Sequence, residues 1–265
     1  MHIQEWLAQT QKEHYGVITG ASSGIGKCFA QRLAKEGIPL LLVSENQGEL
    51  EATADELRQE GAVRIETYVA NFFKPAEVRK LAKFLTQKKI SIFVNNAGIG
   101  MKGLFHTNSA EAYNQLININ IAAMTTLMHA VLPGLQQQNY GLVINVSSIN
   151  SLVSIPHNQV YTASKAYVTS FARALAYENQ DTKIIFQLLL PGTTDTPFHT
   201  RQDASPQMGV MLPDDVARIS LESVGVKEVI PNKADWLVPL IARIVPTQVA
   251  MRIAVYALKM RLGVK

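Results

Sequence analysis

A tyrosine and a lysine in the stretch SSINSLVSIPHNQVYTASK (147–165) have the side-chain types and the spacing for proton transfer. Tyr161 and Lys165 are four residues apart, so they share one face of the segment if it is helical. A tyrosine has a reference pKa of about 10, and a nearby ammonium group favours the phenolate and lowers that pKa. Such a tyrosine can give a proton to a carbonyl oxygen or take one from an alcohol. Spacing alone leaves open which of the five serines in this stretch assists it.

A glycine-rich turn near the N-terminus indicates a second kind of chemistry, the binding of a pyrophosphate. The stretch TGASSGIG (19–26) follows an apolar run and opens a segment with helical character. Gly20 permits a tight exit from a strand, while Gly24 and Gly26 let the backbone approach the phosphates. The free N–H groups and the positive dipole of the helix N-terminus then favour the anion. The spacing G-x-x-x-G-x-G in this position predicts a dinucleotide site.

An acidic residue lies where the ribose of such a dinucleotide would be recognised. Glu45 comes nineteen residues after Gly26, just past the second apolar run. A carboxylate there accepts hydrogen bonds from the ribose hydroxyls and repels a 2′-phosphate. Because the loop 44–49 contains no Lys or Arg, we expect NAD(H) to be favoured over NADP(H). Two alternatives stay open, namely that Lys27 binds a phosphate and that Glu45 points into solvent.

The rest of the chain predicts the scaffold that positions these residues. Short apolar runs alternate with longer helical segments, which indicates a parallel sheet covered on both faces. We therefore expect an α/β protein with a Rossmann-type doubly wound parallel sheet of about seven strands. The predicted strands are 15–20, 39–44, 63–70, 90–95, 141–148 and 183–190, and the predicted helices are 24–36, 47–60, 75–88, 109–138 and 158–179.

Composition argues against several other classes of protein. The chain has 265 residues, of which 47% are hydrophobic and 17% charged, so it can form a full core as one domain over 1–265. The net charge of +4 comes with no arginine-rich run, and no spacing is typical of a metal site, so we expect neither nucleic acid nor metal to bind. One cysteine, no signal-peptide core and no run of about 18 apolar residues predict a cytoplasmic protein.

Five motifs follow one another along the chain: TGASSGIG (19–26), NNAG (95–98), Asn120 in ININ (117–120), YTASK (161–165) and PGTTDTPF (191–198). With these motifs in this order, the chain resembles the short-chain dehydrogenase/reductase family over essentially its whole length. The resemblance implies a catalytic set of Asn120, Ser148, Tyr161 and Lys165, because the family places its serine thirteen residues before the tyrosine. Ser147 is a poor second choice, since strand alternation turns it to the opposite face.

The family roles imply hydride transfer between a nicotinamide and a carbonyl or secondary alcohol. Tyr161 would be the acid or base, and Ser148 would hold the substrate oxygen. Lys165 would also bind the nicotinamide ribose, and Asn120 would fix a water that links Lys165 to solvent. Two other functions stay open: a catalytically idle NAD(P)-binding sensor or scaffold, and an isomerase or dehydratase on the same fold.

The resemblance also implies the residues that bind the cofactor. One departs from the family pattern, because Asn71 lies where an Asp beside the adenine is common, and we expect weaker binding there. Thr196 would contact the nicotinamide amide. The full predicted set is Gly20, Ser22, Ser23, Gly24, Ile25, Gly26, Glu45, Asn71, Phe72, Asn96, Ala97, Gly98, Tyr161, Lys165, Pro191, Gly192, Thr194 and Thr196.

The predicted substrate pocket is mostly apolar, which indicates a lipophilic ketone, aldehyde or secondary alcohol. Residues 201–215 are polar and broken by two prolines, so we expect a loop or lid before a last helix, and we assign the substrate lid to 201–225. The residues expected to line the pocket are Met101, Phe105, Ile149, Leu152, His157 and Phe198.

The C-terminal tail, 235–265, is apolar and basic, and its part 247–262 has the pattern of an amphipathic helix. It can pack on the domain, join a second subunit or lie on an anionic membrane surface, and packing is the favoured interpretation. Family members commonly pair through the long helices, here 109–138 and 158–179. We therefore expect a homodimer or homotetramer.

Overall fold

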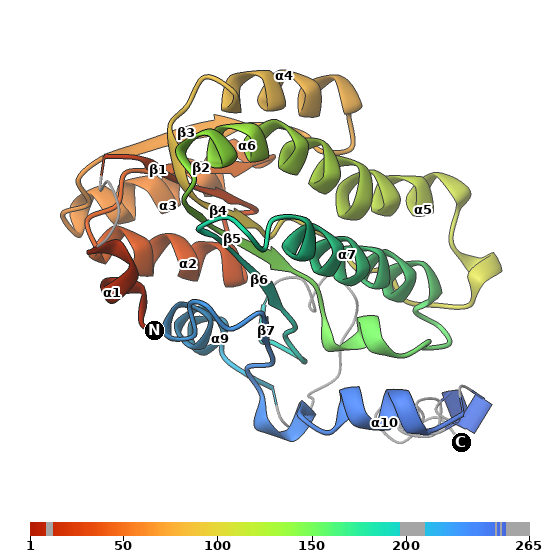
Figure 1. Ribbon diagram of the computed structural model, residues 1–265. Helices are drawn as coiled ribbons and strands as arrows, with labels where there is room; N and C mark the ends of the chain where they lie inside the picture. Colours follow the sequence, from red (N-terminus) through yellow and green to blue (C-terminus); the bar gives the residue numbers. More distant parts are fainter. Residues whose placement is uncertain (9–12, 197–209, 247, 250, 253–265) are drawn as a thin grey trace.

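The computed structural model contains one sheet of parallel strands (Figure 1). It describes residues 1–8, 13–196, 210–246, 248–249 and 251–252. The strands lie in the order β3-β2-β1-β4-β5-β6-β7, and all neighbours are parallel. The six predicted strands are confirmed to within two residues, and β7 is the seventh. Their bounds are β1 (Tyr15–Thr19), β2 (Leu40–Ser44), β3 (Ile65–Val69), β4 (Ile90–Asn95), β5 (Gly141–Val146), β6 (Ile184–Leu189) and β7 (Glu228–Val229).

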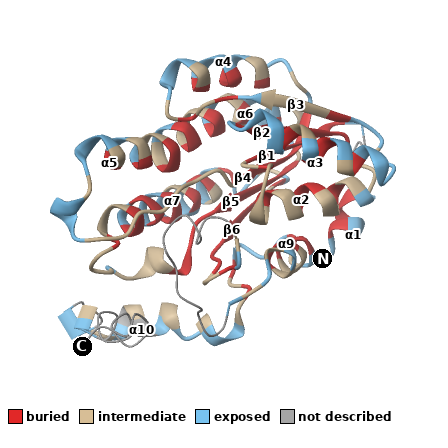
Figure 2. Ribbon diagram, turned by 180° about the vertical axis from the view of Figure 1, so that it is seen from behind, coloured by how far each residue is buried: buried red, intermediate tan, exposed pale blue. Residues whose placement is uncertain are grey.

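Helices cover both faces of this sheet, as the strand–helix alternation predicts (Figure 2). Helices α1, α2, α3 and α9 pack on one face, and α4, α6 and α7 pack on the other. The α-helices are α1 (Ile3–Leu7), α2 (Gly24–Lys35), α3 (Gln47–Gln59), α4 (Pro75–Leu85), α5 (Ala110–Ile117), α6 (Met124–Gln138), α7 (Gln159–Glu178), α9 (Pro213–Glu222) and α10 (Val238–Ile244). Three short helical turns matter below: the π-helical turn η2 (Asn118–Ala123) and the 3₁₀ turns η1 (Phe105–Thr107) and η3 (Ile149–Leu152).

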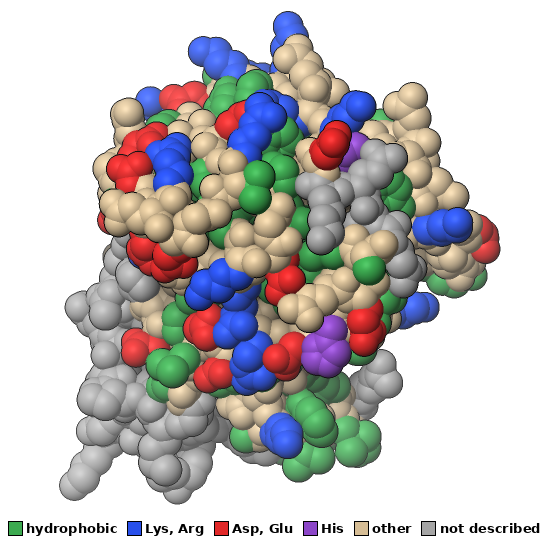
Figure 3. Space-filling view, turned by 90° about the vertical axis from the view of Figure 1, so that its left-hand side faces the viewer, with side chains coloured by type: hydrophobic (Ala, Val, Ile, Leu, Met, Phe, Trp, Pro, Cys, Tyr) green, Lys and Arg blue, Asp and Glu red, His purple; other side chains and the backbone are tan. Residues whose placement is uncertain are grey.

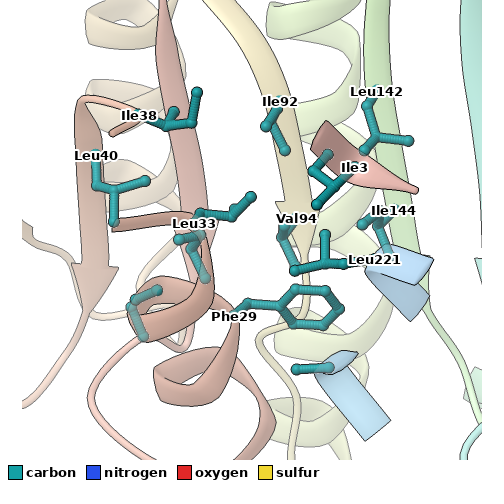
Figure 4. Packing of buried hydrophobic residues seen from close by; sticks show 14 of the residues in the cluster. Ile3, Phe29, Leu33, Ile38, Leu40, Ile92, Val94, Leu142, Ile144 and Leu221 are labelled. Carbon is teal, nitrogen blue, oxygen red and sulfur yellow. The ribbon is translucent and has the colours of Figure 1, made fainter. Parts of the chain in front are cut away.

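The apolar runs become central strands because both of their faces are covered. Every residue of β1, β2, β4 and β5 is buried, whereas the edge strand β3 is partly exposed. In the core cluster of Figure 4, Phe29 of α2, Ile3 of α1 and Leu221 of α9 lie around Val94 of β4. This packing fixes α2, and with it the glycine turn that precedes the helix.

The strand order reverses between β1 and β4, and this reversal locates the binding crevice. From β1 the chain proceeds outward to β2 and β3, and it then returns to place β4 on the other side of β1. Ligands of open α/β sheets bind at such a switch point, beyond the carboxyl ends of the strands. Here those ends carry the glycine turn after β1 and the NNAG segment after β4.

Two features of the fold differ from the sequence prediction. The first residues form helix α1, whose Ile3, Trp6 and Leu7 are buried in the core. The predicted lid over 201–225 is wrong from residue 213 onward, because α9 buries Val216 and Leu221 against the sheet and packs on α2. Residues 201–209 lie outside the described residues.

The long helical tract predicted at 109–138 is interrupted by a π-helical turn. Among the described residues, Ala110–Gln138 is one helical stretch that is long and apolar enough to cross a membrane. Its Leu127, Val131 and Leu135 are buried against the sheet, so this side of the stretch belongs to the core. Helix α10 begins one residue before Pro239, so this proline lies in the first turn, where it is tolerated.

Candidate active site

The glycine turn has a backbone that only glycine fits. Gly20 and Gly24 have positive φ angles of 68° and 54°. A Cβ on Gly26 would lie 2.2 Å from the carbonyl oxygen of Gly20, which no side chain can tolerate. The turn is thus a cradle of bare backbone at the N-terminus of α2, and it fits the pyrophosphate of a dinucleotide.

A hydrogen-bond clamp ties this turn to the NNAG segment. The hydroxyl oxygen of Thr19 accepts from the backbone N–H groups of Asn96 and Ala97, at 2.9 and 3.0 Å. The side-chain amide of Asn96 donates to the carbonyl oxygen of Thr19 at 2.9 Å. The sequence prediction did not include Thr19, because the clamp joins segments far apart in the chain and no local pattern indicates it.

Of the residues predicted to bind the adenosine part of the cofactor, two have an accessible side-chain group and one has a buried side chain. Glu45 is exposed just past β2. The side-chain oxygen of Asn71 already accepts from the N–H of Phe73 at 2.8 Å, and its amide nitrogen is the group suited to an adenine. The side chain of Phe72 is buried in the core, so only its backbone is available to a cofactor.

The segment after β6 closes the cofactor side of the crevice. A Cβ on Gly24 would lie 3.0 Å from the side chain of Thr196, so the glycine turn and this segment are in contact. Thr194 is buried and forms an isolated bridge with Met211. A Cβ on Gly192 would lie 2.1 Å from a carboxylate oxygen of Asp235, which brings the C-terminal segment against the site.

Tyr161 and Ser148 come together at the carboxyl end of β5. Ser148 follows that strand and caps η3 through the N–H of Asn150, and it also forms a side-chain hydrogen bond with Tyr161. Burial raises the pKa of Tyr161 to about 12, while the hydrogen bond from Ser148 acts in the opposite direction. The predicted lowering of this pKa by the neighbouring lysine is therefore not produced by the protein alone, because desolvation of the phenolate dominates.

Lys165 lies one helical turn after Tyr161 on α7, as predicted. Its ammonium group is 6.0 Å from the centre of the Tyr161 ring and donates to the carbonyl oxygen of Val146 at 3.0 Å. Burial lowers the pKa of Lys165 to about 8. A Cβ on Gly98 would lie 3.4 Å from this ammonium nitrogen, so the NNAG segment lies against Lys165.

Asn120 is buried within the π-helical turn η2, a kind of helix distortion that is frequent at functional sites. Its amide nitrogen donates to the carbonyl oxygen of Ile99 at 2.9 Å and to the hydroxyl of Ser164 at 3.0 Å. Its side-chain oxygen accepts from the N–H of Ile99 at 2.9 Å. The hydroxyl of Ser164 in turn donates to the carbonyl oxygen of Tyr161 at 2.7 Å. Asn120 therefore ties the NNAG loop to α7, whereas its predicted role in holding a water stays a prediction.

Three serines near the site hold helix α7 in place and have no assigned role in the reaction. Ser147 donates to the carbonyl oxygen of Lys165 at 2.9 Å and is therefore engaged with the backbone of α7. Thr169 bonds to Ser147 at 2.8 Å and donates to Ser151 at 2.8 Å. Ser147, Ser151 and Ser164 are functional supports that the sequence analysis did not assign, since their partners lie in other elements.

The predicted substrate-lining residues differ in how firmly the fold holds them. Ile149 is buried. His157 has a positive φ of 65°, and its backbone carbonyl oxygen accepts from the N–H of Gly103 at 2.8 Å. Met101 and Leu152 are half-buried. Phe105 is 62% exposed and stacks on Tyr113 with ring centres 5.1 Å apart. Phe198 lies outside the described residues.

A dinucleotide cradle beside a buried Ser–Tyr–Lys set defines a Rossmann-type protein with the residues for nicotinamide chemistry. The chain belongs to the short-chain dehydrogenase family, because the family model described as short chain dehydrogenase matches residues 15–207. The match to the family model confirms the family that the motifs predict, and the seven-stranded parallel sheet confirms the fold.

Relatives of the chain include both a named reductase and a protein named inactive. The human "Inactive hydroxysteroid dehydrogenase-like protein 1" is 33% identical over 184 residues, which are 68% of this chain and 56% of that one. The zebrafish (Danio rerio) "Very-long-chain 3-oxoacyl-CoA reductase-A" is 29% identical over 218 residues, or 81% of this chain and 68% of that one. The chain thus spans little more than half the length of the first of these relatives.

A solved structure shares both the fold and part of the sequence. The short-chain dehydrogenase from Sphingobium yanoikuyae in complex with NADPH superposes with a TM-score of 0.78. It is 32% identical, and the match covers 82% of this chain and 86% of that one. Nucleotide-dependent oxidoreduction is therefore supported at the level of the family.

Proposed function

We propose that the protein is an NAD(P)-dependent oxidoreductase that interconverts a carbonyl compound and a secondary alcohol. The observation that carries this proposal is the convergence of Ser148 and Tyr161 by a hydrogen bond, with Lys165 on the same helix. The three residues lie at the carboxyl edge of the sheet, beyond the strand ends that also carry the glycine cradle. A core tyrosine with no chemical role would not need a serine, a lysine and a dinucleotide turn in this register.

Each residue of the site has a role in this reaction. A bound nicotinamide supplies the hydride in one direction and accepts it in the other. In reduction, the carbonyl carbon gains the hydride and the carbonyl oxygen gains the phenolic proton of Tyr161, which yields the alcohol. Ser148 donates to the same oxygen and stabilises the negative charge that develops on it. Lys165 supplies a positive charge near the resulting phenolate.

Both titratable groups of the site carry a proton at neutral pH. With a pKa of about 12, Tyr161 holds its proton and can act as the acid when a carbonyl is reduced. Lys165, with a pKa of about 8, is mainly protonated at that pH. In the oxidising direction Tyr161 must first lose its proton, which the positive charge of Lys165 assists.

The preference for NAD(H) over NADP(H) rests on Glu45. This exposed carboxylate follows β2 at the place where the adenosine ribose is recognised, and it would repel a 2′-phosphate. Ser22 and Ser44 share a hydrogen bond of 2.9 Å next to it, and neither residue provides a positive charge. Lys27 is engaged by Glu56 at 2.6 Å, which argues against its use as a phosphate ligand.

A lipophilic carbonyl is the proposed substrate class. Met101, Ile149 and Leu152 are apolar, and Phe105 adds an exposed aromatic ring to the same side of the site. The name of the zebrafish relative refers to a long acyl chain, which agrees with an apolar pocket.

A catalytically idle cofactor-binding protein is the second candidate, favoured by the similarity to a relative named inactive. The two candidates agree on cofactor binding and differ on turnover. The presence of Asn120, Ser148, Tyr161 and Lys165 in one hydrogen-bonded site supports the enzyme.

The outer faces of α6 and α7 support the predicted pairing of subunits. Tyr167 is partly exposed, stacks on Phe171 and shares a hydrogen bond of 3.0 Å with Thr125. Such a rigid aromatic surface suits contact with a second copy. Cytoplasmic localisation stays a prediction from the sequence.

The experiment that tests this function measures cofactor binding and turnover in the same preparation. Calorimetric titrations with NADH and NADPH come first, and a panel of ketones and aldehydes is then followed at the nicotinamide absorbance. We expect tighter binding of NADH and turnover of lipophilic carbonyls. Tyr161→Phe should lower kcat by about 10²- to 10⁴-fold and change cofactor affinity far less, because the glycine turn and Lys165 remain. Binding without turnover of any carbonyl would support the idle protein, and full activity of Tyr161→Phe would refute the assigned acid.

A further inference from the structure

The segment after α9 exposes a group of large apolar side chains that the described part of the protein leaves uncovered. Leu240 and Ile244 are four residues apart on α10 and are 55% and 70% exposed. Trp236 and Leu237 precede them and Val249 follows them, all three exposed. We call these five residues the C-terminal apolar surface. Soluble helices normally turn such a stripe toward a core, so an outward stripe indicates a partner.

The same region holds all of the protein's excess charge. The chain contains 25 basic and 21 acidic residues, and residues 235–265 contain five of the former against Asp235 alone. The first 234 residues therefore carry 20 charges of each sign and balance to zero. Figure 3 shows this balance on one face, where Lys and Arg side chains lie beside Asp and Glu side chains. Apolar and basic residues thus coincide in one part of the chain.

We propose that the C-terminal apolar surface docks on an anionic lipid bilayer. Exposed Trp and Leu side chains suit the interface between headgroups and acyl chains, and basic residues are attracted to anionic lipids. A symmetric contact with a second copy would bring two segments of net charge +4 together, which opposes that alternative. The indole N–H of Trp236 donates to the carbonyl oxygen of Ile230 at 2.9 Å, so its ring is held in place while remaining exposed.

This surface is close to the substrate side of the active site. Helix α10 packs against η3, the turn that Ser148 caps (Figure 1). Asp235, directly before Trp236, lies against Gly192 of the segment after β6. A bilayer under α10 would therefore be next to the place where a lipophilic carbonyl enters, and this consequence alone rests on the proposed function.

The test uses the full chain with vesicles of phosphatidylcholine and with vesicles of phosphatidylcholine mixed with phosphatidylglycerol. Binding is measured by cosedimentation without cofactor or substrate, so the outcome does not depend on catalysis. We expect binding to the anionic vesicles that weakens as salt is added. Replacing both apolar residues of α10, Leu240→Asp with Ile244→Asp, should weaken binding at least about tenfold.

Val63→Asp is the matched control, because Val63 is an exposed aliphatic residue of similar exposure, 71%, outside this surface. Sedimentation velocity and far-UV circular dichroism of each variant report its assembly and folding. Should the double variant not fold, Trp236→Ala and Arg252→Glu repeat the test at two other exposed positions. Equal binding to both kinds of vesicle, or binding unchanged by these substitutions, would overturn the proposal. A double variant that only dissociates a dimer would assign the surface to a second copy.

Discussion

Two regions of the active site are built in different ways. We call Asn120, Ser148, Tyr161 and Lys165 the floor of the site, and we call the exposed surroundings of Phe105 and Leu240 its mouth. On the floor, each of the four proposed catalytic residues is at most 8% exposed, and Lys165 donates to the carbonyl oxygen of Val146 on β5. Asn120 alone makes three hydrogen bonds, to Ile99 and Ser164. At the mouth, Phe105 and Leu240 are more than half exposed. Phe105 stacks on Tyr113, whose hydroxyl also donates to the carbonyl oxygen of Phe105 at 3.1 Å.

This difference explains why the reaction follows from the structure more readily than the substrate does. Proton and hydride transfer tolerate little displacement, so the floor needs many contacts with fixed geometry. Recognition of an apolar group needs area more than exact placement, so the mouth can vary without disturbing the floor. Substitutions on the floor should therefore change stability and turnover together, and substitutions at the mouth should change substrate preference alone.

The largest effect is expected where the floor has no free space. Gly26→Ala would place a Cβ 2.2 Å from the carbonyl oxygen of Gly20, so the backbone of the turn must move. We expect a loss of about 3 kcal/mol in the free energy of unfolding, at the upper end for overpacking, and about 100-fold weaker cofactor binding. Chemical denaturation and calorimetry with NADH measure the two quantities.

Gly134→Ala is the matched control for that substitution. Gly134 lies inside α6, and a Cβ there would meet nothing within 4 Å. Alanine should raise stability by about 0.5–1 kcal/mol, because it favours the helix more than glycine does. If Gly26→Ala were as stable as Gly134→Ala and bound NADH normally, the turn would not be the cradle described above.

The next effect comes from the buried charge of Lys165. Its pKa is about 8 in the folded protein and 10.5 as the reference value, so the unfolded chain binds more protons between these pH values. Lys165 alone should therefore add about 2 kcal/mol to stability from about pH 8 to about pH 10. Burial raises the pKa of Cys28 to about 11 and that of Tyr161 to about 12, so these two groups lower stability as pH rises. The contribution of Lys165 is therefore measured as a difference: the stability of the wild type minus that of Lys165→Met should grow by about 2 kcal/mol over this range. The difference between the wild type and Lys183→Met, at an exposed lysine, should stay constant. Parallel curves for wild type and Lys165→Met in this range would show that the ammonium is not desolvated.

A smaller effect is expected at Ser164, which supports the floor without touching substrate. Ser164→Ala removes the hydrogen bonds to Asn120 and Tyr161, and we expect a loss of about 1–2 kcal/mol in stability. Turnover should fall about tenfold with an unchanged KM for the cofactor, because α7 and the NNAG loop lose their link. Ser154→Ala, at an exposed serine of the preceding loop, is the control. A stability loss without a change in kcat would reduce Ser164 to a structural residue.

The sequence was sufficient to predict those parts of the site in which the function requires a particular residue type at a particular spacing. The glycines of the turn and the pair Tyr161 and Lys165 belong to this group, since the backbone or the reaction allows no substitute. The alternation of apolar runs and helices likewise predicted the sheet, because burial on both faces demands it.

The parts that sequence did not predict depend on contacts between distant segments. Thr19 reaches Asn96 across 77 positions, and Ser164 reaches Asn120 across 44, so neither leaves a local pattern. The pKa of Tyr161 was predicted in the wrong direction because desolvation depends on the depth of burial, which sequence does not give. Phe72 stays a predicted cofactor contact through its backbone, because its side chain completes the core.

The smallest effect on the fold should come from the mouth, at Phe105. Phe105→Ala removes a ring that is 62% exposed, so stability should change by only about 0.5 kcal/mol. For a small ketone, kcat and KM should stay unchanged, because the floor is intact. For a lipophilic carbonyl, KM should rise several-fold with kcat nearly constant, since the ring contributes binding area alone. A fall in kcat for both substrates would mean that η1 positions the floor, and the separation of floor from mouth would then fail.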